Sequence, residues 1–303
     1  MPNDRGDRGD RGSHPKHVLV GDDLVLAHEA RISPFDRGFL FGDGIYEMVR
    51  VFDGIPLSMN AHQDRMAKGL LKTGITGFDV RRYSTIVDRL LEVEDLRDAC
   101  VYLQVTRGVE IPRSHVPVTP LTPTVFAYAV PSPPLSTLTE PASTTAILQP
   151  DQRWHHCDLK AIGLLPNVMA AATAVEAGST EAILHRGDRI SEGSHSNVLA
   201  CLDGTVVSPE IDGPFPILPG TMLALALESA RSAGIPVECR PLSVPELHEA
   251  DEIAITSTRR ILHSITAIDG RPLRGGPVFG HLFDRMVASI ASAIAGEPTA
   301  AAR

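Results

Sequence analysis

Apolar and polar residues follow short, strand-like patterns in the first part of the chain. HVLV and LVLA flank Gly21-Asp22-Asp23, and YEMVRVF and IPLS flank Asp53-Gly54, a dipeptide typical of hairpin turns. Apolar residues then recur with helical spacing in residues 60–74 and 79–97. The next two apolar segments, CVYLQVTRG and TVFAYAV, predict buried strands. The pattern predicts a first structural unit that ends near residue 130.

Turn-forming residues separate this unit from a second one. Residues 131–141, PSPPLSTLTEP, predict a linker because they are rich in proline and serine. The rest predicts strands near 143–149, 181–185, 197–201 and 205–208, and helices near 166–177, 220–233 and 277–295. We therefore predict an N-terminal domain in residues 16–130 and a larger domain in residues 142–303. Residues 1–15 are charged and glycine-rich, and predict a disordered tail.

Composition and charge narrow the class of protein. The chain has 303 residues, of which 43% are hydrophobic and 21% charged, as in ordinary globular proteins. A net charge of -9 gives no electrostatic basis for binding nucleic acid or an anionic membrane, and the apolar stretches are too short to span one. The four cysteines lie far apart and the N-terminus lacks a signal-peptide pattern. We therefore predict a cytoplasmic protein with free thiols.

One lysine has an unusual position. The chain holds four lysines and 24 arginines, and Lys160 lies in DLKAIGLLPN, next to an apolar stretch. Arginine stays protonated in proteins, whereas a lysine in apolar surroundings can lose its proton and act as a nucleophile. Lys160 is therefore a candidate Schiff-base lysine, with a surface lysine at a strand end as the alternative.

Four other segments contain side chains suited to a small ligand, although each one alone also has an ordinary structural explanation. Arg65 follows His62 by three positions on a predicted helix and could hold a phosphate. Glu192, in ISEGSHSN, could pair with a heterocyclic nitrogen. LPGTML begins a helix whose free N–H groups, with Thr221, could bind an anion. TSTRR, residues 256–260, offers hydroxyl groups at the end of a predicted strand.

Three further motifs allow both structural and functional interpretations. TRGVEIPRSH brings Arg107, Arg113 and His115 close together, as a solvated loop or as a site for a small carboxylate or phosphate. RGFLFGDGIYE, residues 37–47, favours a tight turn that leads into a strand. WHHCD, residues 154–158, does not predict a metal site, because adjacent histidines on a strand point to opposite faces.

Taken together, these segments supply the groups that hold pyridoxal phosphate: an amine, a carboxylate, an arginine, a helix N-terminus and hydroxyl groups. The ordered motifs DRGFLFGDGIYE, HQDRM, VYLQVTRG, PRSH, DLKAIGLLPN, EAILHRGDRISEGSHSNV and TST make the chain resemble the fold-type IV pyridoxal-phosphate enzymes, most closely the D-amino acid transaminases. The resemblance spans about residues 17–294. It implies an α+β fold, with a small α/β N-terminal domain and a larger, cofactor-binding C-terminal domain that has a β-barrel-like core and flanking helices.

The resemblance also implies roles for individual residues. Lys160 matches the catalytic lysine that binds the cofactor and shuttles the proton, and Glu192 matches the carboxylate that faces the pyridine nitrogen. The matching phosphate-binding residues are Arg65, Thr258, the adjacent Ser257, and Thr221 and Met222 at the phosphate helix. The family usually has Gly-Ile-Thr at that helix, where this chain has Gly-Thr-Met, so a backbone contact is expected there.

Other matches concern the substrate. Tyr46, Arg113 and His115 match the carboxylate-binding residues of the D-amino acid enzymes, and Tyr102 lies in the matching strand nearby. Arg259 and Arg260 follow TST where the family tends to have small polar residues, so one of them could bind a second carboxylate or alter the binding of the first.

The resemblance implies a ping-pong transaminase that uses a D-amino acid and a 2-oxo acid. Branched-chain aminotransferase, (R)-amine transaminase and aminodeoxychorismate lyase activities on the same fold stay open as alternatives. The branched-chain enzymes carry a tyrosine where this chain has Leu165, and both they and the lyases lack the Pro-Arg-x-His loop. The resemblance also implies a homodimer with sites near the subunit boundary.

Overall fold

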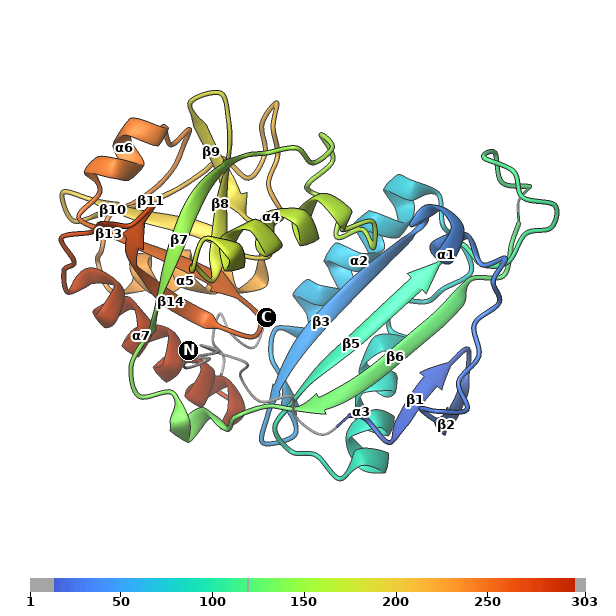
Figure 1. Ribbon diagram of the computed structural model, residues 1–303. Helices are drawn as coiled ribbons and strands as arrows, with labels where there is room; N and C mark the ends of the chain where they lie inside the picture. The colour runs from blue at the N-terminus through green and yellow to red at the C-terminus, as the bar shows by residue number, and fades with distance from the viewer. Residues whose placement is uncertain (1–13, 119, 298–303) are drawn as a thin grey trace, which may run out of the picture.

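Two β-sheets and the helices around them form the protein, as seen in a computed structural model that describes residues 14–118 and 120–297. Figure 1 shows the N-terminal sheet on the right and the C-terminal sheet on the left. The predicted tail, residues 1–15, lies almost wholly outside the described residues. No helix in the described parts of the chain has both the length and the apolar character needed to cross a membrane.

The N-terminal sheet is antiparallel, with the strand order β2-β1-β6-β5-β3-β4. Its strands are β1 (His17–Val20), β2 (Asp23–Leu26), β3 (Gly44–Phe52), β4 (Ile55–Pro56), β5 (Ala99–Thr106) and β6 (Thr124–Pro131). The two predicted hairpins are confirmed, because β1 pairs with β2 and β3 pairs with β4. Asp53 and Gly54 both have positive φ at the second turn, as a tight hairpin of this type requires.

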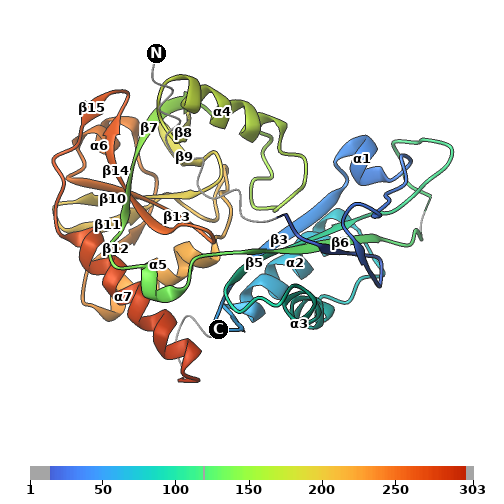
Figure 2. The same cartoon turned by 60° about the horizontal axis from the view of Figure 1, so that its bottom comes forward.

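Helices α2 (Met59–Thr73) and α3 (Arg82–Glu94) cover one face of this sheet (Figure 2). The buried residues of each helix recur at helical spacing, which places an apolar stripe against the strands. A short helix, α1 (Arg37–Phe41), precedes β3. The sequence predicted only a tight turn there, because two glycines and a five-residue length leave too little periodicity to indicate a helix.

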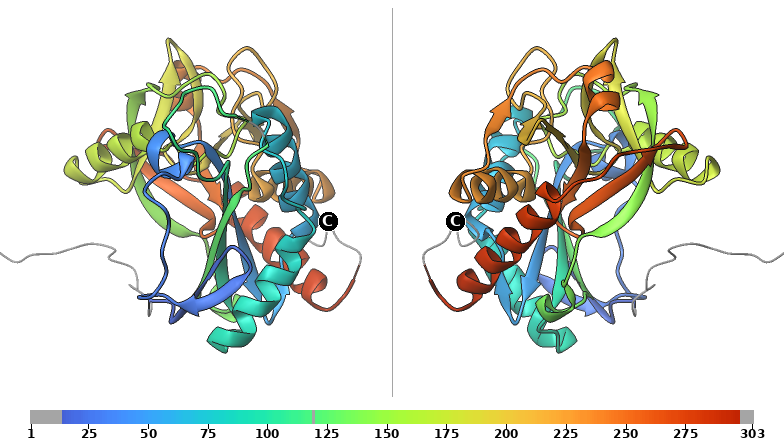
Figure 3. Two further views of the ribbon diagram at one scale, coloured as in Figure 1. Left: turned by 90° about the vertical axis from the view of Figure 1, so that its right-hand side faces the viewer. Right: turned by 90° about the vertical axis from the view of Figure 1, so that its left-hand side faces the viewer.

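The C-terminal sheet has nine strands in the order β12-β11-β10-β13-β14-β7-β8-β9, with β15 paired to β14. They are β7 (Ala142–Pro150), β8 (Glu181–Arg186), β9 (Arg189–Gly193), β10 (Asn197–Leu202), β11 (Thr205–Ser208), β12 (Val237–Cys239), β13 (Glu252–Ser257), β14 (Ile261–Ile268) and β15 (Arg271–Pro272). The sheet is strongly curved (Figures 1 and 3). This curvature fits the predicted barrel-like core.

Both faces of this sheet are buried. On β10, Val198 and Ala200 face one apolar cluster, while Leu199 and Cys201 face another. The second cluster packs on α5 (Thr221–Ser232) and α7 (Val278–Ile294). The other helices are α4 (Leu165–Glu176), α6 (Val244–Glu249) and the 3-10 turn η1 (Leu135–Thr137).

The predicted linker connects the two sheets. β6 ends at Pro131 and β7 begins at Ala142, with η1 between them. Arg50 of β3 donates a hydrogen bond of 2.6 Å from Nη2 to the carbonyl of Pro133, which ties the connection to the N-terminal sheet. The division into two domains stays a prediction.

Candidate active site

A cavity of about 470 Å³ lies where the two sheets meet, within the size range of small-ligand sites. Side chains from both sheets line it, together with the segment before α4 and the first residues of α5. Eight of the residues singled out from the sequence line this cavity: Tyr46, Arg65, Lys160, Glu192, Thr221, Met222, Ser257 and Thr258.

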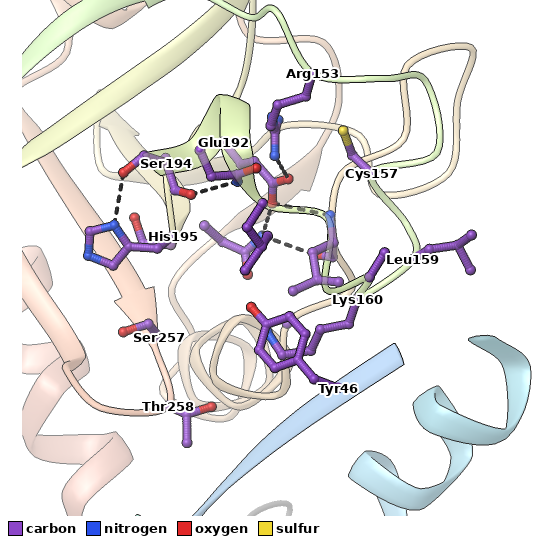
Figure 4. Close-up of a pocket in the computed structure, with 18 of the residues that line it drawn as sticks. Tyr46, Arg153, Cys157, Leu159, Lys160, Glu192, Ser194, His195, Ser257 and Thr258 are labelled. Carbon is purple, nitrogen blue, oxygen red and sulfur yellow. Dashed lines mark hydrogen bonds and ion pairs between the residues drawn. The ribbon is translucent and has the colours of Figure 1, made fainter. Parts of the chain in front are cut away.

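Lys160 approaches the cavity from a segment that pairs with β3. The backbone N–H of Tyr46 donates to the Lys160 carbonyl at 2.9 Å, and the N–H of Ile162 donates to the Gly44 carbonyl at 3.1 Å. A Cβ on Gly44 would lie 2.8 Å from Cδ1 of Ile162 and 3.0 Å from the carbonyl oxygen of Val105, so a larger residue there would require these neighbours to shift. The lysine Nζ lies 4.3 Å from the centroid of the Tyr46 ring. Figure 4 shows both side chains at the cavity.

Glu192 lies in β9 and is buried, whereas the strands predicted from the sequence did not include residues 189–193. Its Oε1 accepts a hydrogen bond of 2.6 Å from Arg153, and its Oε2 accepts bonds of 3.1 Å from Asn197 and from the N–H of Leu218. Burial raises the pKa of this carboxyl, and Arg153 opposes the rise. One acceptor position on Oε1 stays open for a ligand.

Arg153 was not predicted as part of the site. It lines the cavity, and its Nε and Nη2 donate to the two oxygens of Asp151 at 2.9 Å. Burial alone would raise the pKa of Asp151, but its hydrogen bonds with Arg153 and the charge of Arg186 hold that pKa at about 2. The sequence feature that could have indicated Arg153 is the charged pair Asp151-x-Arg153 in the segment that leads to Lys160.

Arg65 reaches the cavity through a buried ion-pair network. Its Nε and Nη2 donate to the two oxygens of Glu47, at 2.8 and 2.7 Å, and its Nη1 donates to the Pro219 carbonyl at 2.8 Å. Glu47 also accepts a bond of 2.7 Å from His62. Three of the five N–H donors of Arg65 are thus used, and two remain for an anion.

Backbone and hydroxyl groups complete this end of the cavity. Helix α5 begins at Thr221, and its N-cap residue, Gly220, gives no side-chain hydrogen bond to the free N–H groups in the described part of the chain. The hydroxyl of Thr256 is buried in the cavity wall and has no hydrogen-bond partner among the residues that the structure describes, and Ser257 and Thr258 line the same side. Free N–H groups, a guanidinium and hydroxyl groups form a donor set suited to a phosphate.

Arg113 and His115 do not line this cavity. Their loop packs on α1: the guanidinium of Arg113 lies 4.3 Å from the Phe41 ring centroid, and the His115 ring lies 5.3 Å from it. Arg37 fixes the loop, because its Nη1 and Nη2 donate to the carbonyls of Ser114 and His115 at 2.6 and 3.1 Å.

Three other predicted residues also lie outside the lining residues. Tyr102 lies on β5, the strand next to β3, and stacks on Tyr46 with ring centroids 5.5 Å apart. Arg260 donates to the buried Glu181 at 3.2 Å, and its contact with substrate stays a prediction. Arg259 is exposed.

Comparisons with known proteins identify the family of the chain. Residues 44–268 match the model of the amino-transferase class IV family. The chain is 35% identical to the D-alanine aminotransferase of Listeria innocua over 281 residues, which is 91% of this chain and 96% of that protein. It is 34% identical to the D-alanine aminotransferase of Staphylococcus epidermidis over 264 residues, 86% of this chain and 92% of that protein.

Solved structures support the fold. The branched-chain aminotransferase of Thermoproteus uzoniensis, solved with norvaline, superposes with a TM-score of 0.80 at 22% identity, covering 93% of this chain and 95% of that one. A hypothetical aminotransferase of Mycobacterium tuberculosis in its PLP-bound form superposes with a TM-score of 0.76 at 22% identity, covering 90% and 99%. The fold-type IV architecture expected from the sequence is therefore confirmed, and the chain belongs to the amino-transferase class IV family.

Proposed function

We propose that the protein is a pyridoxal-phosphate-dependent transaminase that exchanges an amino group between a D-amino acid and a 2-oxo acid by a ping-pong mechanism. The observation that carries this proposal is the convergence of Lys160, Glu192 and Arg65 with the free start of α5 on one cavity. The D-alanine specificity in the names of the similar curated proteins supports the choice of substrate.

The residues present fit the cofactor. Arg65, the N–H groups at Thr221 and Met222, and the hydroxyls of Ser257 and Thr258 would hold its phosphate. At the other end, the open acceptor position of Glu192 would accept a hydrogen bond from the protonated pyridine nitrogen. When bound, pyridoxal phosphate supplies an aldehyde that takes the amino group and a ring that accepts electrons.

Lys160 is the residue that we assign to proton transfer. Its Nζ would remove the proton from the substrate α-carbon and return a proton on the same side of the cavity, which is general acid–base catalysis. Tyr46 limits where the amine can go, because its ring lies 4.3 Å from Nζ. Glu192, held by Arg153 and Asn197, would keep a negative charge facing the ring nitrogen.

We assign binding of the substrate α-carboxylate to Tyr46, Arg113 and His115. Because Arg113 and His115 lie outside the cavity of their own chain, this role requires a second copy of the chain to place its loop at the cavity. The surface around that loop supports a homodimer: Phe39, Ile111, Val116 and Val118 are between 68% and 76% exposed. Exposed apolar surface of this kind is typical of subunit contacts. The four free cysteines fit a cytoplasmic location.

Transamination by the purified, cofactor-loaded protein tests the proposal. With D-alanine and 2-oxobutyrate we expect pyruvate and D-2-aminobutyrate, and much slower turnover of L-alanine and L-leucine. Faster turnover of L-leucine would replace the proposal with the branched-chain activity, and preferential use of a primary (R)-amine would replace it with amine transamination. Release of pyruvate from aminodeoxychorismate without an acceptor would indicate a lyase.

Lys160 can be tested separately from specificity. Borohydride should fix the cofactor to the wild-type chain at Lys160, as detected by the mass of the modified peptide. Lys160→Ala should abolish this attachment and lower kcat at least about 10²-fold. Lys68→Ala, at a lysine of helix α2 that does not line the cavity, is the control and should keep both properties.

A further inference from the structure

The segment that carries Arg113 and His115 is closed by a hydrogen bond at its two ends. Residues 110–118 belong to the connection from β5 to β6, which lies beside α1 (Figures 1 and 2). Glu110 is buried, and its Oε1 accepts a hydrogen bond of 2.6 Å from the N–H of Val118. Arg113 and His115 lie between these two ends and are exposed. The segment is therefore a closed loop with its two candidate substrate-binding side chains at the surface.

Arg37, the first residue of α1, holds this closed loop from below. The side chain of Arg37 is buried, and its Nη1 donates to Glu110 Oε2 and to the carbonyl of Ser114, both at 2.6 Å. Its Nη2 donates to the carbonyl of His115 at 3.1 Å. A guanidinium donates in fixed directions from a planar group. These bonds therefore set the backbone from which Arg113 and His115 project.

Phe41, the last residue of α1, contacts the projecting side chains themselves. The guanidinium of Arg113 lies 4.3 Å from the centroid of the Phe41 ring, and the His115 ring lies 5.3 Å from it. The guanidinium of Arg37 lies 4.8 Å from the same centroid. A cation over an aromatic ring is attracted by the ring electrons. One ring therefore restricts the positions that Arg113 and His115 can take.

These contacts order an arginine before any ligand arrives. Ordering a flexible side chain on binding lowers affinity, and a side chain that is already ordered avoids this loss. We propose that Arg37 and Phe41 are positioning residues, which hold Arg113 and His115 ready to bind the substrate α-carboxylate in the cavity of a second copy of the chain. Neither of them is among the residues that line the cavity, so they act through the loop. This inference rests on the proposed transaminase function and on its assignment of Arg113.

Replacing the Phe41 ring tests the inference with a mild substitution. In Phe41→Leu, the KM for D-alanine should rise about fivefold with kcat within about twofold, because a contact that favours binding is lost. Phe41→Tyr keeps the ring and should retain the wild-type KM. Calorimetry on the cofactor-loaded protein should show propanoate, which is D-alanine without its amino group, binding more weakly to Phe41→Leu by a similar factor. The affinity for the cofactor should stay unchanged.

Phe78→Leu is the matched control. Phe78 is also half-buried in the N-terminal half, and the guanidinium of Arg82 lies 5.5 Å from its ring centroid. It is not among the residues that line the cavity. The same substitution therefore removes a comparable ring and cation contact, and it should leave the KM for D-alanine and the affinity for propanoate unchanged.

Arg37→Lys tests whether the effect passes through the loop to the neighbouring subunit. Lysine keeps a charge beside Glu110 but lacks the fork that reaches two carbonyls, so the KM for D-alanine should rise about tenfold. The variant is then refolded with an equal amount of Lys160→Ala. In each hybrid dimer, the site that keeps Lys160 receives the loop of the chain with Arg37 intact. Below the raised KM, the mixture should show about a quarter of the wild-type activity with the wild-type KM.

The possible failures are distinguishable. If Phe41→Leu and Arg37→Lys keep the wild-type KM and the wild-type propanoate affinity, the inference is wrong, while the proposed function stands. A KM that stays raised in the hybrid, or an equal change in Phe78→Leu, also overturns the inference. If Arg113→Ala leaves the KM for D-alanine unchanged, the assignment of Arg113 fails and this inference fails with it. If the wild type does not use D-alanine, the proposed function itself fails.

Discussion

Nη1 of Arg153 donates a hydrogen bond of 2.6 Å to Oε1 of Glu192, and their side chains are only 8% and 6% exposed. The same guanidinium binds both oxygens of Asp151, so one cation bridges two buried carboxylates. Arg153 thus offsets the cost of burying Glu192, the group that we expect to face the cofactor ring.

Removal of Arg153 should therefore be costly. Arg153→Met leaves Glu192 buried without its cation, which should lower the free energy of unfolding by about 3–5 kcal/mol and raise the pKa of Glu192 further. Urea unfolding at pH 7 measures the first effect, and loss of cofactor on dialysis reports the second. Arg189→Met, at an exposed arginine on β9, the strand that carries Glu192, should change stability by less than about 0.5 kcal/mol. Equal stability of the two variants would show that Arg153 does not stabilise the site.

The ion-pair network behind the phosphate end predicts a pH dependence of stability. Burial by itself would raise the pKa of Glu47, but Arg65 and His62 lower it from 4.5 to about 2. A lowered folded-state pKa contributes stability that is fully present above the unfolded value of 4.5 and is lost as the pH falls toward 2. The free energy of unfolding should decrease in that window.

Glu47→Gln removes this titration. Urea titrations between pH 7 and the lowest pH at which the protein stays folded give the unfolding free energy as a function of pH. Below pH 4.5, this free energy should fall less steeply for Glu47→Gln than for the wild type, by up to about 1.4 kcal/mol per pH unit. Glu176→Gln, an exposed carboxylate at the end of α4, should follow the wild-type curve. Parallel curves for Glu47→Gln and the wild type would contradict the assignment.

Gly220 offers a steric test of the start of α5. A Cβ there would overlap Oδ1 of Asn197, whose Nδ2 donates to both Glu192 and the carbonyl of Leu218. Gly220→Ala should therefore displace Asn197, cost about 1–3 kcal/mol of stability and weaken cofactor binding. Gly280→Ala lies in α7 with open space around the new methyl group, and should instead stabilise the protein by about 0.5–1 kcal/mol. Thermal unfolding and cofactor titration of the two variants provide the comparison.

Mixing two inactive variants tests whether Arg113 acts on a neighbouring subunit. Lys160→Ala and Arg113→Ala should each lose most activity with D-alanine. When equal amounts are unfolded and refolded together, hybrid dimers would contain one site with both residues intact, restoring about a quarter of the wild-type sites. If Arg113 served its own chain, no intact site would form and the mixture would stay inactive. Light scattering of the wild type checks the dimer itself.

Much of the fold could be predicted from local patterns. The hairpins around residues 21–23 and 53–54 were correct because turn chemistry and strand alternation agree there. Helices α2 and α5 were correct to within two residues at each end because their buried positions repeat with helical spacing. The strand β9 was missed because its Ser-Glu-Gly sequence is typical of a turn, although Glu192 is buried.

Only part of the site could be predicted, because the sequence does not show which distant residues come together in the fold. Motif resemblance located Lys160 and Glu192, but the partners of a buried charge come from distant parts of the chain. Arg153 and Glu192 are 39 positions apart, and Arg65 binds Glu47 across 18 positions. A carboxylate at a core-facing position of a strand, as at Glu47, was the available indication that a buried cation must lie nearby.

The backbone pairing between Lys160 and β3 has a mechanical consequence. Ala161 forms an antiparallel bridge with Ile45, so the lysine-bearing segment of one half is joined edge to edge to the sheet of the other half. A hinge rotation that separated the halves would pull this seam apart and shift the amine. The pairing therefore resists such a rotation and fixes the backbone of Lys160 against β3.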